Sequence, residues 1–349
     1  MSGIVRFIVP DSIDDPAQPS GGNVYDRRVC SELEGLGWSV RLRPVAGRWP
    51  GPTPADVAGL ARVLDEAPTG ACVVVDGLVA SAAPELVTRY ADRLHVVVLV
   101  HLPLGVLSPG RRAGEAAMLA RVAGVVATSS WTRTWLVAEY ALSPDAVTVA
   151  LPGTDLGSVA PGTPAGGALL CVGAVTPVKG QDLLVQALAT LEPPEWQCTC
   201  VGSLESDPGF VRELRDLAGH HGVADRMVLA GPRHGADLEA AYHDADVLVL
   251  ASRAETYGMV VTEALAHGLP VIGTCTGGVG EALGTTTDGT LPGVLVAGGD
   301  VAGLGEALRS WLLDARLRER LRAAARDRRR TLPTWRDTAC RVQDALRST

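Results

Sequence analysis

Two glutamates, Glu255 and Glu263, stand eight positions apart in the second half of the sequence, with Gly258 between them. The apolar run at 247–250 predicts a buried strand before them, and a helical pattern begins at about Gly258. A further apolar run at 271–273 predicts the next strand. We therefore expect Glu255 in the loop between strand and helix, and Glu263 about a turn and a half into the helix.

The amino end of this predicted helix has free backbone N–H groups and a partial positive charge, which attract phosphate. A carboxylate at Glu263 can accept hydrogen bonds from a pair of sugar hydroxyls, and Glu255 adds a carboxylate in the loop. Together these features indicate a nucleotide-sugar site. The alternative for an isolated pair at this spacing is a helix-surface glutamate and a solvated loop acid, because glutamate is common on helix surfaces.

The run from 252 to 272 contains Ser, Glu and Gly, followed by Glu-Ala-x-Ala-x-Gly-x-Pro-Val. This order resembles the donor-site signature of retaining glycosyltransferases of family 4. The resemblance implies an α/β protein with the GT-B fold, in which two Rossmann-like domains face each other across a cleft. It also implies that Glu255 holds hydroxyls of the donor sugar and Glu263 those of the ribose. The other donor-binding residues that it implies here are Tyr257, Gly258, Met259 and Val260.

Gly21 and Gly22 follow a loop after the first predicted strand and open a helical pattern. Glycines at a helix start let the backbone approach a ligand closely, and the N–H groups there can face a phosphate. A flexible turn is the alternative. Similar enzymes have a Gly-Gly here that faces the donor diphosphate. No G-x-G-x-x-G follows the strand, which counts against a dinucleotide-dependent oxidoreductase.

Lys179 lies in a segment, 172–184, that looks like the family's Gly-Arg-x-x-x-x-Lys-Gly-x-x-x-Leu pattern. The resemblance implies that Lys179 reaches the donor phosphates as a point charge and neutralises the leaving group; a solvated surface lysine is the alternative. Ala174 stands where similar enzymes carry an arginine. Losing a bidentate phosphate donor costs on the order of 2–4 kcal/mol if nothing replaces it. Arg233 is one candidate replacement.

His101 ends the predicted strand at 96–101, at the edge of a parallel sheet where ligands commonly bind. Similar enzymes place a histidine at this strand end, near the donor sugar, and the resemblance makes His101 a catalytic residue together with Glu255 and Lys179. A hydrogen-bonded structural histidine is the alternative. The segment 276–281 resembles the family's Gly-Gly-x-x-Glu turn, which either shapes the cleft wall or is a plain turn.

Asp244 and Asp246 form a DxD triplet, which binds a divalent metal in another class of glycosyltransferases. Here the triplet directly precedes the strand at 247–250, and we interpret it as a polar strand entry. No metal ligand is therefore predicted. No cofactor is expected either, apart from a nucleotide-diphosphate sugar as co-substrate.

Composition limits the remaining classes. The chain has 349 residues, enough for two domains, with a formal net charge of −8 and 20% charged residues, so a nucleic-acid partner is not expected. The basic cluster at 326–330 is interpreted as a solvated helix face.

No apolar run approaches the length of a membrane span, and the start of the sequence does not resemble a signal peptide. These features predict a cytoplasmic protein without membrane association. The oligomeric state is not readable.

Alternating apolar runs and helical patterns predict two parallel α/β series. We predict an acceptor domain at 1–155, a linker at 156–167, a donor domain at 168–332 and a final segment at 333–349. The resemblance implies that this last segment packs back on the first domain. Predicted strands are 4–9, 40–43, 72–76, 96–101, 125–128 and 147–150 in the first series, and 168–173, 198–202, 227–230, 247–250, 271–273 and 294–297 in the second.

The expected function is a retaining, hexosyltransferase-type glycosyltransferase. It would move a sugar from a nucleotide-diphosphate sugar to a soluble small-molecule acceptor by front-face attack, without a metal or an enzyme nucleophile. Two alternatives stay open. One is a nucleotide-sugar epimerase of GT-B type. The other is a catalytically impaired nucleotide-sugar-binding protein, because Ala174 replaces the expected phosphate-binding arginine.

Overall fold

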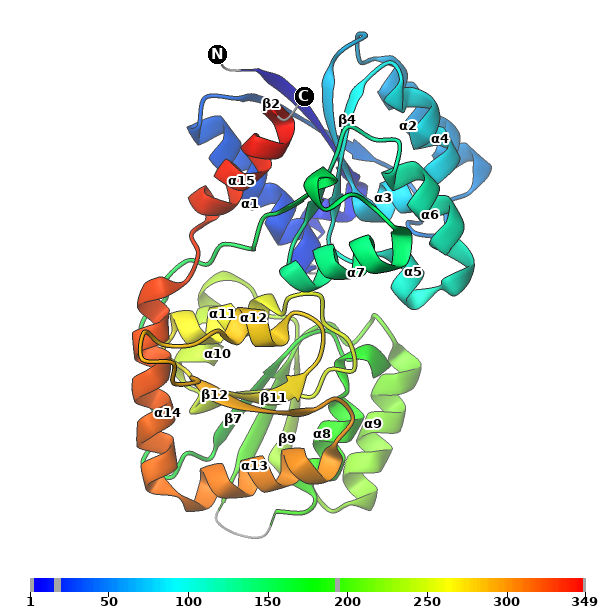
Figure 1. Ribbon diagram of the computed structural model, residues 1–349. Coiled ribbons are helices and arrows are strands. Elements are labelled where there is room, and N and C mark those ends of the chain that lie inside the picture. The colour runs from blue at the N-terminus through cyan, green and yellow to red at the C-terminus, as the bar shows by residue number, and fades with distance from the viewer. Residues whose placement is uncertain (1–2, 16–19, 192–194, 348–349) are drawn as a thin grey trace. The chain divides into compact units, whose positions relative to one another are not determined.

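The computed structural model describes residues 3–15, 20–191 and 195–347. The described chain divides into two compact units, each built on a six-stranded parallel sheet with helices on its faces (Figure 1). The first unit contains residues 3–15, 20–153 and 333–347, and the second contains residues 154–191 and 195–332. The predicted α/β class with two Rossmann-like domains is confirmed.

The sheet of the first unit has the strand order β2-β1-β3-β4-β5-β6. Because β2 lies on one side of β1 and β3 on the other, the strand order reverses between β1 and β3, and ligands of open α/β sheets bind beyond such a point. The strands are mostly valine, isoleucine and leucine, as expected where both faces are covered. Their bounds are β1 Ile4–Pro10, β2 Ser39–Val45, β3 Cys72–Asp76, β4 His95–Val100, β5 Gly124–Ala127 and β6 Val147–Val149.

The helices of the first unit include one from the far end of the chain. Figure 1 shows α15 (Trp335–Arg347) beside α1 (Gly21–Gly35), and Trp335 packs edge-on against Tyr25 with ring centroids 5.8 Å apart. Thr338 Oγ1 donates a hydrogen bond to the carbonyl of Leu151 at 2.7 Å. The remaining helices are α2 Pro54–Asp65, α3 Gly77–Ala82, α4 Pro84–Ala91, α5 Leu104–Leu107, α6 Arg112–Leu119 and α7 Ser130–Tyr140.

The sheet of the second unit has the order β12-β11-β10-β7-β8-β9, so its order reverses between β7 and β10. Its strands are β7 Ala168–Val172, β8 Gln197–Val201, β9 Met227–Gly231, β10 Val247–Leu250, β11 Val271–Cys275 and β12 Gly293–Ala297. Its helices are α8 Gln181–Leu188, α9 Pro208–His220, α10 Gly235–His243, α11 Met259–Ala266, α12 Val279–Leu283, α13 Val301–Leu313 and α14 Ala315–Arg328. Each predicted strand corresponds to one of β1–β12, with ends within two residues.

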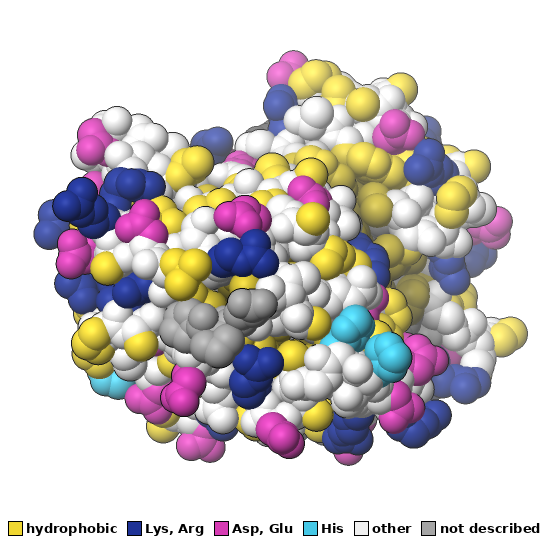
Figure 2. Space-filling view, turned by 90° about the horizontal axis from the view of Figure 1, so that it is seen from below, with side chains coloured by type: hydrophobic (Ala, Val, Ile, Leu, Met, Phe, Trp, Pro, Cys, Tyr) yellow, Lys and Arg dark blue, Asp and Glu magenta, His cyan; other side chains and the backbone are white. Residues whose placement is uncertain are grey.

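The basic cluster at 326–330 is only partly a solvated face, which corrects the interpretation from sequence. Arg328 Nε donates to the carbonyl of Leu283 at 3.1 Å, and Arg329 donates to the carbonyls of Ala266 and Gly157 at 2.7 and 2.8 Å. These guanidinium groups bind backbone oxygens of the second unit. On the face drawn in Figure 2, basic and acidic side chains are interspersed. Among the described helices, none has the length and apolar character needed to cross a membrane.

Asp246 fastens the segment before β7 to the rest of the second unit. Its side chain is fully buried and accepts hydrogen bonds from Thr163 Oγ1 at 2.7 Å, the Ala168 N–H at 2.9 Å and Arg322 Nη2 at 2.7 Å. Asp244, by contrast, is exposed at the end of α10. The second aspartate of the DxD triplet is thus a polar strand entry with a structural role.

Replacing Asp246 should destabilise the protein strongly. Asp246→Ala would leave the half-buried Arg322 guanidinium without its carboxylate, and removing one partner of a buried ion pair costs about 3–5 kcal/mol. Asp244→Ala is the matched control and should change the free energy of unfolding by less than about 0.5 kcal/mol. Urea unfolding of both variants provides the measurement. Equal, small effects would contradict the structural role of Asp246.

Candidate functional site

Two loops meet at the carboxyl ends of β7 and β10, where the strand order of the second unit reverses. One loop runs from 173 to 180 and the other from 251 to 258. Gly180 has φ +68°, and a Cβ there would lie 2.0 Å from the carbonyl oxygen of Ala251. Only glycine permits this backbone conformation together with this close approach. Gly180 therefore allows the two loops to touch.

Lys179 and Glu255 form an ion pair at this point. Lys179 Nζ lies 2.6 Å from Glu255 Oε1, and Ser252 Oγ donates to the same oxygen at 2.9 Å. The side chain of Glu255 is 10% exposed and that of Lys179 is 32% exposed. Two site residues predicted from separate motifs are thus in direct contact, with a cation and a carboxylate on the same edge of the sheet.

Helix α11 begins at Met259, directly after the loop that carries Glu255. Gly258 has φ +92° and precedes the helix without a side-chain cap, so the first N–H groups of the helix have no capping side chain. Met259 and Val260 are half-buried on its first turn. Tyr257 is buried, and its hydroxyl has no hydrogen-bond partner among the described residues. Tyr257 therefore packs inward, which leaves its backbone as the part nearest to any ligand at the loop.

Glu263 lies further along α11 and is half-buried. Tyr242 donates its hydroxyl to Glu263 Oε2 at 2.6 Å, and the Tyr242 ring stacks on His267 at 5.0 Å. Burial raises the pKa of Glu263, the charge of Glu239 adds to the rise, and the hydrogen bond from Tyr242 opposes it. One carboxylate oxygen of Glu263 is thus held in place, and the other is left for a further donor.

The predicted Gly-Gly turn lies directly behind the Glu255 loop. The N–H of Gly278 donates to the Glu255 carbonyl at 3.1 Å. A Cβ at Gly277 would lie 1.6 Å from the same carbonyl oxygen, and one at Gly278 would lie 2.3 Å from the Thr256 carbonyl oxygen. Any side chain at either position would push the loop away. The turn thus fixes the loop that carries Glu255.

Arg233 is the candidate replacement for the arginine that is missing at position 174. Arg233 follows β9 at the edge of the sheet, with β8 between β9 and β7. Ala174 itself contributes its carbonyl, which accepts a hydrogen bond from Gln181 Nε2 at 3.1 Å.

Arg253 supports the turn that carries Lys179, a role that the sequence analysis missed. Its guanidinium binds both carboxylate oxygens of Asp182 at 2.7 and 2.6 Å and the carbonyl of Pro177 at 2.6 Å. Its N–H donates to the Val178 carbonyl at 2.8 Å. Arg253 stands two residues before Glu255 in the motif, but its partner Asp182 lies 71 residues away. No local pattern reveals such a pair.

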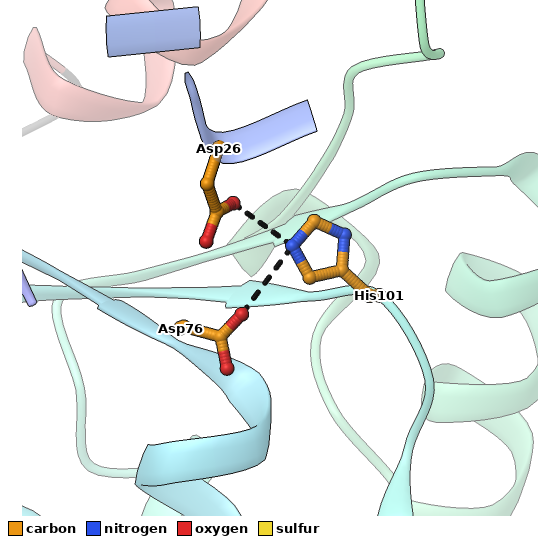
Figure 3. Close-up of side chains that lie close together, drawn as sticks. All are labelled: Asp26, Asp76 and His101. Atoms are coloured by element: carbon orange, nitrogen blue, oxygen red, sulfur yellow. Dashed lines mark hydrogen bonds and ion pairs between the residues drawn. The ribbon is translucent and has the colours of Figure 1, made fainter. Parts of the chain in front are cut away.

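His101 is the centre of a polar cluster in the first unit. His101 Nε2 lies 2.9 Å from Asp26 Oδ1 and 3.5 Å from Asp76 Oδ2 (Figure 3). Asp76 ends β3, His101 follows β4, and Asp26 comes from α1, so the cluster lies where this sheet reverses its strand order. Neither aspartate was predicted from the sequence as a site residue. The signal available for Asp76 was its place as the last residue of an apolar strand.

Gly21 and Gly22 open α1 beside this cluster. A Cβ at Gly22 would lie 3.1 Å from His101 Cδ2, which is tighter than ordinary van der Waals contact. Gly21 is exposed. The predicted Gly-Gly pair therefore allows the amino end of α1 to close on the imidazole ring.

The charges of the cluster interact strongly. Burial and the neighbouring charge of Asp26 raise the pKa of Asp76 to about 7, and the charge of His101 opposes them. Burial lowers the pKa of His101, but the charge and hydrogen bond of Asp26 and the charge of Asp76 outweigh it, so the net change is upward. Such groups share protons and titrate together.

Asp26, Asp76 and His101 are also the described residues that offer three possible metal-ligand atoms within 4.8 Å of one another. The ring nitrogen among these atoms, Nε2, is the one within hydrogen-bond distance of Asp26 Oδ1.

Two solved structures superimpose on nearly the whole of this chain. A sucrose-phosphate synthase from Thermosynechococcus elongatus superimposes with a TM-score of 0.80 at 21% identity, covering 99% of this chain and 98% of the other. Anabaena Alr3699/HepE, solved in complex with UDP and glucose, superimposes with a TM-score of 0.78 at 17% identity, covering 99% of each chain. The chain therefore has the GT-B fold.

Sequence relatives of this chain are named as glycosyltransferases. Residues 166–328, all in the second unit, match the family model described as "Glycosyl transferases group 1". The D-inositol 3-phosphate glycosyltransferase of Xylanimonas cellulosilytica is 33% identical over 67% of this chain, and that of Frankia alni is 33% identical over 62%. The chain spans 59% and 57% of the lengths of these two relatives.

Proposed function

We propose that this chain is a glycosyltransferase that moves a sugar from a nucleotide-diphosphate sugar to a small-molecule acceptor. The observation that carries the proposal is the contact between Lys179 and Glu255 at the carboxyl ends of β7 and β10. It lies within the residues that match the glycosyl transferase family model. The complex of Anabaena HepE with UDP and glucose supports a nucleotide sugar as the donor.

The ion pair can exchange partners when a donor binds. An ammonium bound to a carboxylate can transfer to a diphosphate, which carries more negative charge and more acceptor oxygens. Glu255 would then accept hydrogen bonds from hydroxyls of the sugar, and the open amino end of α11 would face the phosphates. Lys179 would stabilise the charge on the departing diphosphate, which is the main requirement of this reaction.

Glu263 would bind the ribose. Tyr242 holds one carboxylate oxygen at 2.6 Å, so the carboxylate is oriented before any ligand arrives. The other oxygen can then accept from the ribose hydroxyls without losing rotamer freedom on binding. Retention of configuration by front-face attack, with no enzyme nucleophile, completes the proposal and rests on the resemblance of the 252–272 run to family 4. Proton NMR of the product, which distinguishes the two anomers, tests this part.

Removing the carboxylates should reduce transfer without unfolding the chain. Glu255→Ala and Glu263→Ala should each lower turnover by about 100-fold or more, because each removes a preorganised contact to the reacting donor. Glu319→Ala, an exposed change on α14, is the control and should leave turnover unchanged. Turnover and circular dichroism are measured on the same preparations. Full activity in both site variants would refute the assignment.

Transfer should not need a divalent metal, because the proposed charge stabilisation comes from Lys179 and the amino end of α11. We expect turnover in excess EDTA to stay within about twofold of the untreated value. Complete loss that Mn²⁺ or Mg²⁺ restores would contradict this. It would direct attention to Asp26, Asp76 and His101, since Asp246 is already engaged in structural hydrogen bonds.

Two other functions would use the same nucleotide-sugar site. An epimerase of GT-B type would convert a nucleotide sugar into its epimer in the absence of any acceptor, so incubation with the donor alone separates it from a transferase. A catalytically impaired binding protein would bind the donor without turnover. Ala174 is the specific observation that favours this second candidate. An alanine side chain cannot supply the charge-assisted hydrogen bonds that an arginine would give to the donor phosphates.

A new cation at position 174 distinguishes a weakened phosphate site from a complete one. If the site lacks a cation, Ala174→Arg should tighten nucleotide-diphosphate binding about tenfold or more through a charge-assisted hydrogen bond. Lys179→Ala should weaken binding and abolish transfer. Calorimetric titration of UDP, GDP, ADP and TDP into the wild type and both variants provides the measurement. Unchanged binding and turnover in Lys179→Ala would refute the phosphate role of the 173–180 loop.

A further inference from the structure

His101 stands between two carboxylates that approach it from different elements of the first unit (Figure 3). We propose that Asp26 and Asp76 are positioning residues that keep the proton of neutral His101 on Nε2, so that Nδ1 accepts a hydrogen bond from a hydroxyl of the bound substrate. The proposed function supplies the hydroxyl-bearing ligand, and the proposal rests on it to that extent. The position of the proton, however, can be tested in the ligand-free protein.

The geometry determines which nitrogen carries the proton. Nε2 is 2.9 Å from Asp26 Oδ1 and 3.5 Å from Asp76 Oδ2. An ionised carboxylate only accepts hydrogen bonds, so the nitrogen between two such groups is the one stabilised by a proton. The lone pair of a neutral ring then lies on Nδ1. Figure 3 shows this second ring nitrogen on the side of His101 away from both carboxylates.

The ring is also the accessible part of the cluster. The side chain of His101 is 20% exposed, whereas those of Asp26 and Asp76 are 1% and 6% exposed. Among the described residues, no hydrogen bond engages His101 other than the one to Asp26. A ligand can therefore contact the imidazole ring, whereas the two buried carboxylates influence the ligand only by setting the protonation of that ring.

Packing prevents the ring from turning. A Cβ at Gly22 would lie 3.1 Å from His101 Cδ2, so the start of α1 already closes one side of the ring. Tyr25 meets the imidazole edge-on at 5.1 Å, and its hydroxyl donates to the Ala150 carbonyl at 2.9 Å. Trp335 packs against the Tyr25 ring at 5.8 Å. A ring flip that exchanged the two nitrogens would have to displace these groups.

The cluster holds more negative charge than the ring alone can balance. Asp26 Oδ2 is buried without a hydrogen-bond partner, and among the described residues neither carboxylate forms an ion pair with a lysine or arginine. Two further titratable groups on α1 stay neutral, because burial and the charge of Asp26 raise the pKa of the Tyr25 hydroxyl and that of the Cys30 thiol. Burial and the charge of Asp26 also raise the pKa of Asp76 to about 7, so the cluster takes up a proton near neutral pH.

Acid should therefore weaken recognition of the hydroxyl. A second proton on the ring would go to Nδ1, which would change that atom from an acceptor to a donor. Burial lowers the pKa of His101, but Asp26 and Asp76 raise it by more, so this change begins at a higher pH than in a free imidazole. Binding of the hydroxyl is present above the pKa of the cluster and is lost as the pH falls through it.

The first experiment is ¹⁵N NMR of the His101 side chain across a pH titration of the ligand-free protein. We expect a protonated Nε2 and an unprotonated Nδ1 at alkaline pH, with a pKa above that of a free imidazole. In Asp26→Asn the pKa should fall by about one unit or more, because the charge that stabilises the imidazolium is gone. Asp14→Asn, on an exposed residue before α1, is the control and should leave the pKa unchanged. A proton on Nδ1 at alkaline pH would overturn the proposal.

The second experiment is the pH dependence of kcat/KM. If Asp26 positions and charges His101, Asp26→Asn should move the acid limb of the profile to lower pH. A role in folding alone would lower kcat/KM equally at every pH and would overturn the proposal. Asp76→Asn provides a second variant if Asp26→Asn does not fold, since an asparagine Oδ1 can still cap α3. Absence of turnover in the wild type would count against the proposed function, while the NMR result would still decide the position of the proton.

Discussion

The ion pair between Lys179 and Glu255 is the contact on which the second unit's site depends. It joins the loops after β7 and β10, and the surrounding groups serve to keep those loops together. Gly180 has no side chain at the point where the two loops touch. Gly277 likewise has none at its close approach to the Glu255 carbonyl oxygen. Arg253 donates a hydrogen bond to the Pro177 carbonyl and so holds the turn that carries Lys179. An exposed ion pair contributes little to stability, but removing one partner of a pair with a nearly buried carboxylate leaves that charge uncompensated.

The two sheets reach a similar arrangement with different charges. Each places polar side chains at the point where its strand order reverses, as expected for open α/β sheets. The second unit pairs one cation with one carboxylate there, whereas the first surrounds one imidazole with two buried carboxylates. The ion pair of the second unit suits a diphosphate. The imidazole of the first unit suits uncharged hydroxyl groups that exchange hydrogen bonds with a ring nitrogen.

Much of this fold is predictable from the sequence because parallel strands buried on both faces are uninterrupted apolar runs. The strands at 72–76 and 247–250 have the predicted bounds for that reason. Lys179 and Glu255 were found from motifs that are local in sequence. Asp26 and Asp76 were not, because their relation to His101 arises from three separate elements and leaves no spacing pattern. The same holds for Arg253 and Asp182, and for Tyr257, whose ring direction depends on the packing around it.

The first unit is discontinuous along the chain, because α15 lies after the whole of the second unit in sequence. During synthesis on the ribosome, residues 154–332 leave the exit tunnel before the helix that completes the first unit. The second unit can therefore fold while the first is still open along one flank of α1. Trp335 covers Tyr25, which in turn supports His101. The imidazole thus acquires its final surroundings only late in translation, so proteolytic removal of α15 would disturb a site more than 200 residues earlier in the chain.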